Sequence, residues 1–361
     1  MITLFLKTGC FCNPGACQKE LNLSSEDILN NFKKGHVCWD DNDIIDNKPT
    51  GSVRISFGYI STKKDIEIFI EFVNKYFIET EEKIQILNDI DTKKTLKKII
   101  LYPIKSCQGM NVNEWKINEF GLEYDREWTL IDEFGKGIKL NKEPKLSLIY
   151  PTITKEKLIL NSKGFDPLEI NLSIFPSQKN DLKICENNTQ GLIYDENINE
   201  WFQNVLQRKC YLIRKDPDIN RLSFTNDKLN FSNEAQFLMI STKSMDELNE
   251  RINKNVSSSN WLIERFRPNF VFEGEKLIAF EEDNYEKVSI GNLNFEVNGR
   301  CNRCSMICVD SETLNQTYEP LRTLAKFRRE KGRIFFGILM NTQNFGSKIK
   351  VGENIKVLNK F

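Results

Sequence analysis

Lys98-Ile-Ile-Leu-Tyr-Pro-Ile104 is an apolar, β-branched stretch that suits a buried strand. Short strand-like segments with turn residues between them recur downstream. They are expected at 121–131, near Leu146, and at 158–160, 168–172, 210–213 and 350–357. Short strands at close spacing are typical of an antiparallel barrel or sandwich. The sequence therefore predicts a mostly β fold of the α+β class, because a few helices are also expected.

Helical patterns are confined to a few places. Ser24-Ser-Glu-Asp-Ile has an N-cap serine with acids in the first turn, and Ser61-Thr-Lys-Lys-Asp65 is typical of a capping box. The second of these is followed by apolar residues at helical spacing: Ile66, Phe69, Ile70, Val73 and Phe77. Further helices are expected at 244–252 and around 321–327. The apolar face of the helix that begins near Ile66 must pack on something.

Composition excludes several classes of function. The 361 residues contain 51 basic and 51 acidic side chains, so no overall field attracts nucleic acid or an anionic membrane. We expect no secretory signal and no membrane span, because the apolar start is brief and no run of about 18 apolar residues exists. Ten cysteines in such a chain predict reduced thiols and a cytoplasmic location. His36 is the only histidine, so at most one site in this chain can use an imidazole. His36 itself is expected to be structural.

The stretch from Glu296 to Asp310 carries the most chemistry, because ten of its residues include three cysteines and two arginines. Thiolates are soft metal ligands, and arginines grip carboxylate or phosphate. Three interpretations are open from the residues alone. Cys301 and Cys304 are half of a zinc site completed by Cys308 and a distant thiol, or they are buried and unliganded, or one thiolate binds the metal of a cofactor.

Two further features lie near the N-terminus. Cys10, Cys12 and Cys17 lie in or beside a loop rich in Gly, Pro and Asn, where a thiol is accessible to a partner. In the alternating stretch Gly51-Ser-Val-Arg-Ile-Ser-Phe-Gly58, Arg54 lies on the polar face of a strand. Arg54 is therefore either a carboxylate ligand or a solvated edge-strand residue.

Lys7-Thr-Gly-Cys-Phe-Cys-Asn-Pro-Gly-Ala-Cys17 and His36-Val-Cys-Trp-Asp-Asp41 resemble segments of the eukaryotic molybdenum cofactor sulfurases. In that family they lie at the end of a pyridoxal-phosphate domain of the class V aminotransferase-like cysteine desulfurases. The resemblance implies that Cys12 is the catalytic cysteine that carries a persulfide. It also implies that Arg54, in the Arg-x-Ser-x-Gly strand, binds the carboxylate of the substrate.

This first resemblance covers only residues 1–80, and no lysine has a context that matches the Schiff-base position of the desulfurases. Without that aldehyde cofactor as an electron sink, the carbon–sulfur bond of cysteine has no evident route to cleavage. We therefore expect this chain alone not to release sulfur from cysteine, and pyridoxal phosphate to belong only to the full-length family enzyme. We also expect exposed apolar surface near Ile66, Phe69 and Val73, where the large domain would pack.

The rest of the chain carries six ordered motifs. They are Tyr102-Pro-Ile-Lys-Ser-Cys107, Gly121-Leu-Glu-Tyr-Asp-Arg-Glu-Trp128, Arg265-Phe-Arg-Pro-Asn269, Glu282-Asp283, Cys301-Asn-Arg-Cys304 with Asp310, and Glu319-Pro-Leu-Arg-Thr-Leu324. Together they resemble the MOSC family, a β-barrel found at the C-terminus of molybdenum cofactor sulfurases and in amidoxime-reducing molybdenum enzymes. The resemblance implies a MOSC β-barrel preceded by a small α/β remnant of a desulfurase domain.

The MOSC resemblance also implies site residues. Cys304 matches the cysteine that ligates molybdenum or handles sulfur in catalysis. The positions that hold the pterin and its phosphate correspond to Lys105, Ser106, Arg126, Arg267 and Asn269. A molybdopterin needs one soft ligand at the metal and hard donors at its phosphate, which agrees with this set. Each residue also has a simpler interpretation: Lys105 is solvated, Arg126 pairs with Asp125, and Arg267 pairs with Glu264. Packing is expected for Cys107, Cys185, Cys210 and Cys308.

The predicted domains are a desulfurase-like remnant at 1–80, a linker at 81–96, an N-terminal MOSC barrel part at 97–215 and a MOSC domain at 216–361. The implied function is sulfuration of the molybdenum cofactor, with molybdenum–molybdopterin bound and with hydroxylase apoenzymes of the xanthine dehydrogenase and aldehyde oxidase type as partners. Neither nucleic acid nor membrane is expected. Two alternatives are a molybdopterin carrier and a reductase like the amidoxime-reducing enzymes.

Overall fold

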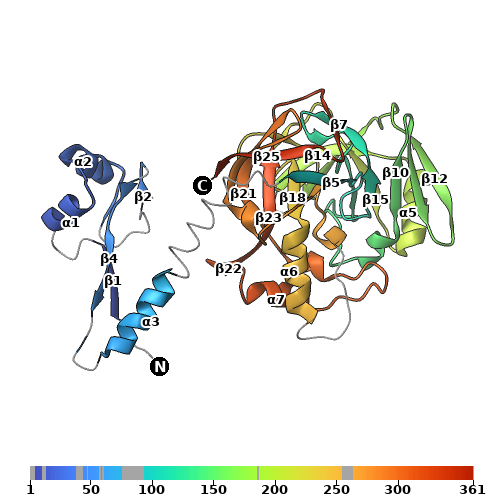
Figure 1. Cartoon of the computed structure of the whole chain (residues 1–361). Coiled ribbons are helices and arrows are strands. Elements are labelled where there is room, and N and C mark those ends of the chain that lie inside the picture. Colours follow the sequence, from blue (N-terminus) through green and yellow to red (C-terminus); the bar gives the residue numbers. More distant parts are fainter. Residues whose placement is uncertain are drawn as a thin grey trace. The chain divides into compact units, whose positions relative to one another are not determined.

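The computed structural model describes residues 5–9, 14–37, 44–46, 48–56, 58, 61–74, 93–184, 187–253 and 263–360 (Figure 1). The chain forms two compact units, Met1–Asp91 and Thr92–Phe361, and each is considered by itself. No described helix is long and apolar enough to cross a membrane.

The first unit combines short strands with small helices. Its elements are β1 (Phe5–Gly9), α1 (Pro14–Glu20), α2 (Ser25–Lys33), β2 (Ile44–Ile45), β3 (Lys48–Pro49), β4 (Ser52–Ser56) and α3 (Lys63–Val73). Strand β1 pairs antiparallel with β4, and β2 with β3. Both predicted helix starts are confirmed, because Ser24 and Thr62 each form a capping box with the aspartate three residues later.

Helix α3 keeps an apolar face that no described part of the chain covers. None of its described side chains is buried. Ile66 and Ile70 are 38% and 51% exposed, whereas Phe69 and Val73 are half-buried. The expected exposed apolar surface is therefore present at Ile66 and only partial at Phe69 and Val73.

The second unit is built on a closed β-barrel, which confirms the predicted mostly β, α+β fold. Seven strands pair in the order β18–β19–β5–β25–β20–β21–β23, and β23 returns to β18. These strands are β5 (Lys94–Leu101), β18 (Phe237–Ser241), β19 (Phe270–Gly274), β20 (Tyr285–Ile290), β21 (Leu293–Asn302), β23 (Arg333–Asn341) and β25 (Asn354–Lys360). Only β18 and β19 are parallel. Closure leaves the barrel without a free edge.

Apolar side chains at alternate positions fill the barrel. Phe237, Phe270 and Phe295 come from three different strands, and their ring centroids lie 5.0–5.7 Å apart. Such rings stabilise a core beyond the area that they bury. Strand β5, which the apolar stretch predicted, lies between β19 and β25. The barrel therefore contains strands from both sides of the expected division at residue 215, and β5 begins inside the expected linker.

Smaller sheets and helices flank the barrel (Figure 1). The additional strands are β6 (Met110–Val112), β7 (Glu114–Asn118), β8 (Gly121–Leu122), β9 (Trp128–Ile131), β10 (Tyr150–Ile153), β11 (Lys157–Ser162), β12 (Phe165–Asn171), β13 (Gln178–Ile184), β14 (Asn187–Ile193), β15 (Tyr211–Lys215), β16 (Arg221–Leu222), β17 (Lys228–Leu229), β22 (Arg329–Glu330) and β24 (Lys348–Lys350). The helices are α5 (Glu196–Leu206), α6 (Thr242–Asn253) and α7 (Leu321–Ala325), with short 3-10 helices η2 (Pro144–Leu148), η3 (Ile263–Phe266), η4 (Glu281–Asn284) and η5 (Ser305–Cys308).

Most of the predicted elements are present, but several elements of the structure were not predicted, including five of the seven barrel strands: β18, β19, β20, β21 and β23. The strand expected near Leu146 is wrong, because Pro144 begins the 3-10 helix η2, where a proline without N–H is tolerated. Helix α5 was not predicted. It buries Phe202, Val205 and Leu206 along one face, which is the helical pattern that the sequence analysis missed.

Candidate active site

A cavity of about 160 Å³ lies beside the paired strands β18 and β23. Leu238 and Leu339 form part of its wall. Leu238 belongs to an apolar cluster outside the barrel, whereas its neighbour Met239 belongs to the barrel interior. Phe237, the first residue of β18, also lines the cavity although it belongs to the barrel interior, so the cavity lies at the start of β18.

The end of β21 brings two cysteines to this cavity. The register between β21 and β23 shifts twice, once between Val297 and Gly299 and once between Arg300 and Asn302. Bulges of this kind bend a strand and redirect its side chains. Cys301 and Cys304 both line the cavity, but Cys301 is buried and Cys304 is exposed. Of these two cysteines, Cys304 is the accessible one, and it is the residue that the MOSC resemblance implies as a ligand.

Cys301 is held by its neighbour Arg303. The guanidinium Nη1 donates to Sγ of Cys301 at 2.9 Å, and Nη2 donates to the carbonyl of Phe266 at 2.6 Å. Burial raises the pKa of the Cys301 thiol, and Arg303 opposes that rise. Among the described residues, no group of three or more Cys, His, Asp or Glu side chains is placed to hold a metal ion. The zinc interpretation of Cys301 and Cys304 thus has no support in the described part of the chain.

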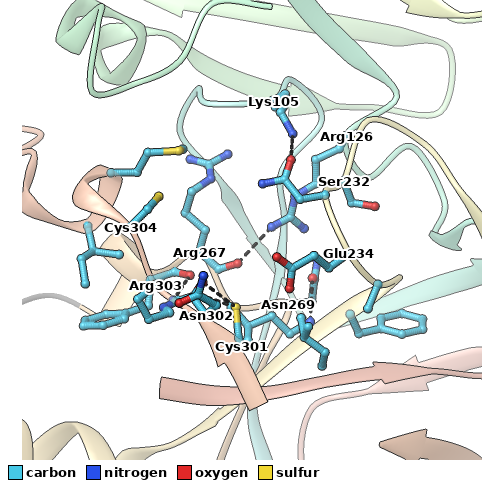
Figure 2. Close-up of a pocket in the computed structure, with 18 of the residues that line it drawn as sticks. Lys105, Arg126, Ser232, Glu234, Arg267, Asn269, Cys301, Asn302, Arg303 and Cys304 are labelled. Atoms are coloured by element: carbon cyan, nitrogen blue, oxygen red, sulfur yellow. Dashed lines mark hydrogen bonds between the residues drawn. The ribbon is translucent and has the colours of Figure 1, made fainter. Parts of the chain in front are cut away.

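Two arginines of the site lie against the ring of Tyr102. The guanidinium carbons of Arg126 and Arg267 lie 4.5 Å and 4.3 Å from the ring centroid. Arg126 also donates to the carbonyl oxygen of Arg267 at 3.0 Å and pairs with the buried carboxylate of Asp125. Figure 2 shows the Arg267 side chain between Cys304 and Arg126.

Arg267 is incompletely paired. Its Nη1 donates to the carbonyl of Cys107 at 2.6 Å, while its buried Nη2 has no hydrogen-bond partner among the described residues. Burial, followed by the like charge of Arg126, lowers the pKa of the Arg267 guanidinium to about 10. The alternative partner Glu264 instead forms an ion pair with Lys98 at 2.8 Å. A buried donor without an acceptor is a position where an anion would be stabilised.

The remaining predicted ligands also line the cavity, but their polar atoms are engaged differently. Lys105 donates to the carbonyl of Phe231 at 2.6 Å and so holds the loop that leads into β18. The hydroxyl of the buried Ser106 lies 3.4 Å from the carbonyl of Ile138. Lys105 is therefore not simply solvated.

Asn269 has a structural role in the barrel. Its side-chain amide donates to the carbonyl of Ile100 at 3.3 Å and accepts from the backbone N–H of Leu238 at 3.3 Å. These bonds tie β19 to β5 and β18, and the residue is 1% exposed. These two bonds use one of the two N–H groups of the amide and one lone pair of its oxygen.

Three predicted ligands have an unusual backbone conformation. The φ angles of Ser106, Arg126 and Arg267 are 71°, 49° and 57°, in the left-handed region that residues other than glycine rarely adopt. Such conformations persist only where the surrounding structure enforces them, and they cluster at functional sites. Sequence patterns give no indication of them.

Some cavity residues were not predicted individually. Arg303 lies between the two cysteines of the motif Cys301-Asn-Arg-Cys304. Its place in that motif is the sequence feature that could have identified it as a cavity residue. The loop from Ser232 to Gln236 also lines the cavity and includes Glu234, the one carboxylate among the described residues of the lining. That loop has no distinctive sequence pattern. The lining contains five cations, namely Lys105, Arg126, Arg265, Arg267 and Arg303.

Other predicted residues lie away from this cavity or outside the described residues. Cys12 lies outside the described residues, as does Cys185. The backbone of Arg54 belongs to β4, but its side chain is not among those described. Cys107, Cys210 and Cys308 are buried free thiols, as expected of packing residues.

Two families match successive parts of the chain. Residues 93–209 match the family described as MOSC N-terminal beta barrel domain, and residues 226–356 match the MOSC domain. The molybdenum cofactor sulfurase of Oryza sativa subsp. japonica is 40% identical over an alignment that covers 97% of this chain and 46% of that protein. That of Arabidopsis thaliana is 38% identical, over 93% of this chain and 46% of that protein.

The chain thus spans less than half the length of these relatives. Among solved structures, the YUAD protein from Bacillus subtilis aligns with 11% identity and a TM-score of 0.33, over 73% of this chain and 94% of that one. A likeness this low supports no argument. The sequence relatives are sufficient: over residues 93–209 and 226–356 the chain belongs to the MOSC family, and over most of its length it is homologous to molybdenum cofactor sulfurases.

Proposed function

We propose that this chain binds the molybdenum cofactor in the cavity beside β18 and β23 and takes part in its sulfuration for molybdenum hydroxylases. One observation carries the proposal. Among the described residues, the exposed thiol of Cys304 shares a cavity with five cations and a single carboxylate. A soft ligand beside convergent hard donors suits a metal attached to an anionic organic group.

The cationic side of the cavity fits a phosphate. Arg126 and Arg267 are like charges around one buried ring, and Nη2 of Arg267 is a buried donor without a partner among the described residues. An anion there would offset the repulsion and accept a charge-assisted hydrogen bond. Lys105 acts on the same side by holding the loop at Phe231, which forms part of the wall.

The two cysteines have different roles in this proposal. Cys304 is exposed, so its thiolate is available as a soft ligand, whereas Cys301 is buried and bonded by Arg303. When bound, the cofactor supplies the metal centre that takes up sulfur. Arg303 shapes the wall between the cysteines and keeps Cys301 in place.

The source of sulfur is the part of the proposal that depends most on the relatives. A persulfide on Cys12 would supply it in the way that the resemblance implies, with Arg54 binding the carboxylate of cysteine and with the pyridoxal-phosphate part of the full-length family enzyme cleaving the carbon–sulfur bond. Attack on a persulfide depends on the thiolate fraction of the attacking sulfur and on access to it. The exposed Cys304 meets the requirement for access.

The test is the molybdenum and pterin content of the chain, purified from a host that makes the cofactor. Pterin near one equivalent is expected for the wild type, with loss of pterin in Arg267→Ala and loss of molybdenum in Cys304→Ala. Arg251→Ala is the matched control, because Arg251 pairs with Glu247 on the surface of α6. Equal pterin in all four proteins, or none in any, would contradict the proposal.

The reductase alternative has its own measurement. The cofactor-loaded chain is given an electron donor and an N-hydroxylated substrate. The proposal expects no turnover, whereas turnover that depends on Cys304 would favour the reductase.

A further inference from the structure

A second and larger hollow, of about 800 Å³, lies against the other side of η5. This short helix contributes Met306 and Ile307 to the cavity described above, but Ser305 and Cys308 to the hollow. It therefore forms a wall between the two. Ser305 directly follows Cys304, so the hollow begins one residue from the accessible thiol.

The hollow has an apolar floor and a polar rim. Cys308 and Ile334, which line it, are 2% and 8% exposed, and Leu321 and Ala325 of α7 add further apolar surface. Tyr318 lines it too and is 84% exposed. A large aromatic side chain in water beside an apolar floor is typical of a surface that binds another protein.

The charge of the hollow is one-sided. Arg322 and Arg329 line it and are exposed, whereas no aspartate or glutamate lines it. Within the described ranges, neither guanidinium takes part in an ion pair. The segment 322–333 contains six Lys and Arg residues and one acid, Glu330, whose carboxylate pairs with Arg300. The chain as a whole is neutral, so this is a local concentration of positive charge.

We propose that this hollow is the docking site for an acidic segment of a partner protein, which places an apolar side chain against Cys308 and Ile334. Arg322 and Arg329 bind carboxylates of the segment through their planar forks of donors, and Tyr318 covers its backbone. Charge complementarity of this kind speeds association and fixes orientation. The site requires a carboxylate-rich peptide with at least one large apolar residue.

The hollow lies close to the cavity that contains Cys304, which suggests why a partner would bind there. A protein bound there lies beside η5, which also forms part of the wall of the cavity that contains Cys304. That the partner is the protein receiving the sulfurated cofactor rests on the proposed function. The presence of a docking site for an acidic segment does not.

The proposal is tested with a fluorescein-labelled peptide of alternating glutamate and leucine, and with the same peptide carrying glutamine in place of glutamate. Fluorescence anisotropy with the full chain is expected to show saturable binding of the acidic peptide. The glutamine peptide should bind roughly tenfold more weakly, because two exposed charged pairs are lost and each is worth up to about fivefold. Binding should weaken further as salt is added.

Two double variants separate the hollow from general electrostatics. Arg322→Glu with Arg329→Glu reverses the two cations that line it. Lys326→Glu with Arg333→Glu makes the same change in net charge at two exposed cations of the same segment that do not line it. The first pair should weaken binding at least about tenfold and the second less than about twofold.

Three results would overturn the docking site: no saturable binding, equal binding of both peptides, or equal losses in the two double variants. Thermal unfolding and pterin content are measured on the same samples. Because all four positions lie outside the cavity, both should match the wild type. If the wild type contains pterin but does not bind the acidic peptide, the docking site is wrong and the proposed function stands. If the wild type binds the peptide but contains no pterin, the proposed function is wrong and the docking site stands.

Discussion

Arg214 on β15 and Arg267 just before β19 are both withdrawn from bulk water, but their surroundings differ. Arg214 is 2% exposed and fully engaged. Its Nε donates to Glu127 at 2.7 Å, its Nη1 donates to the carbonyl of Leu172 at 2.7 Å, and its guanidinium lies against the rings of Trp128 and Phe175. Every feature of this site contributes to holding the sheet around β15 together.

Arg267 has no carboxylate of its own. It has one backbone acceptor, a buried Nη2 without a partner in the described part of the chain, and a second arginine nearby. A protein retains a buried cation in such a state when something outside the chain completes it. The difference between the two arginines distinguishes a group that stabilises the fold from one that is arranged for a ligand.

The largest expected effect follows from removing the paired arginine. Arg214→Met should lower the free energy of unfolding by about 3–5 kcal/mol, because the buried Glu127 is left without its counter-ion. Urea unfolding measures this. Adding Glu127→Gln should restore part of the loss, since no unpaired charge then remains. If the free energy of unfolding of Arg214→Met were within about 1 kcal/mol of that of the wild type, Arg214 would not stabilise the fold, and the contrast with Arg267 would be wrong.

A second buried charge sharpens the comparison because no cation contacts it directly. The carboxylate of Glu282 is fully buried and accepts from the hydroxyls of Ser244 at 2.7 Å and Ser241 at 3.2 Å. Burial, with Asp283 nearby, raises its pKa to about 7. The native state therefore holds a proton that the unfolded state releases between about pH 4.5 and 7.

Stability should fall as the pH rises through this window, because the native state then binds more protons than the unfolded state. Glu282→Gln removes this loss, so at pH 8 the variant should be more stable than the wild type by an amount on the order of 3 kcal/mol. Urea unfolding at several pH values checks the difference. Parallel pH profiles for the two proteins would show that Glu282 is not the group responsible.

The smallest effect on stability is expected at Arg267. In pterin-free protein, Arg267→Met should change the free energy of unfolding by less than about 1 kcal/mol, because the lost bond to Cys107 is offset by relief from the charge of Arg126. Urea unfolding of matched pterin-free samples measures this. A loss as large as that of Arg214→Met would make Arg267 a structural residue and contradict the distinction drawn between them.

Local patterns in the sequence predicted much of this protein. Capping residues marked the starts of α2 and α3, and the apolar stretch before Lys105 marked β5. The ordered motifs identified the MOSC family and selected six residues that the structure brings to one cavity. Capping and amphipathic periodicity act over a few residues, so they can be recognised without the fold.

The tertiary structure alone decided which of these residues meet. Arg126 and Arg267 are 141 positions apart and come together around Tyr102 only because β5 pairs with β19. The bulges that redirect β21 bury Cys301 while Cys304 remains exposed, although both belong to one short motif. Pairing between distant strands sets the burial and neighbours of each group. The sequence therefore determined which chemical groups are present, and the closed barrel determined which of them are buried, paired or left for a ligand.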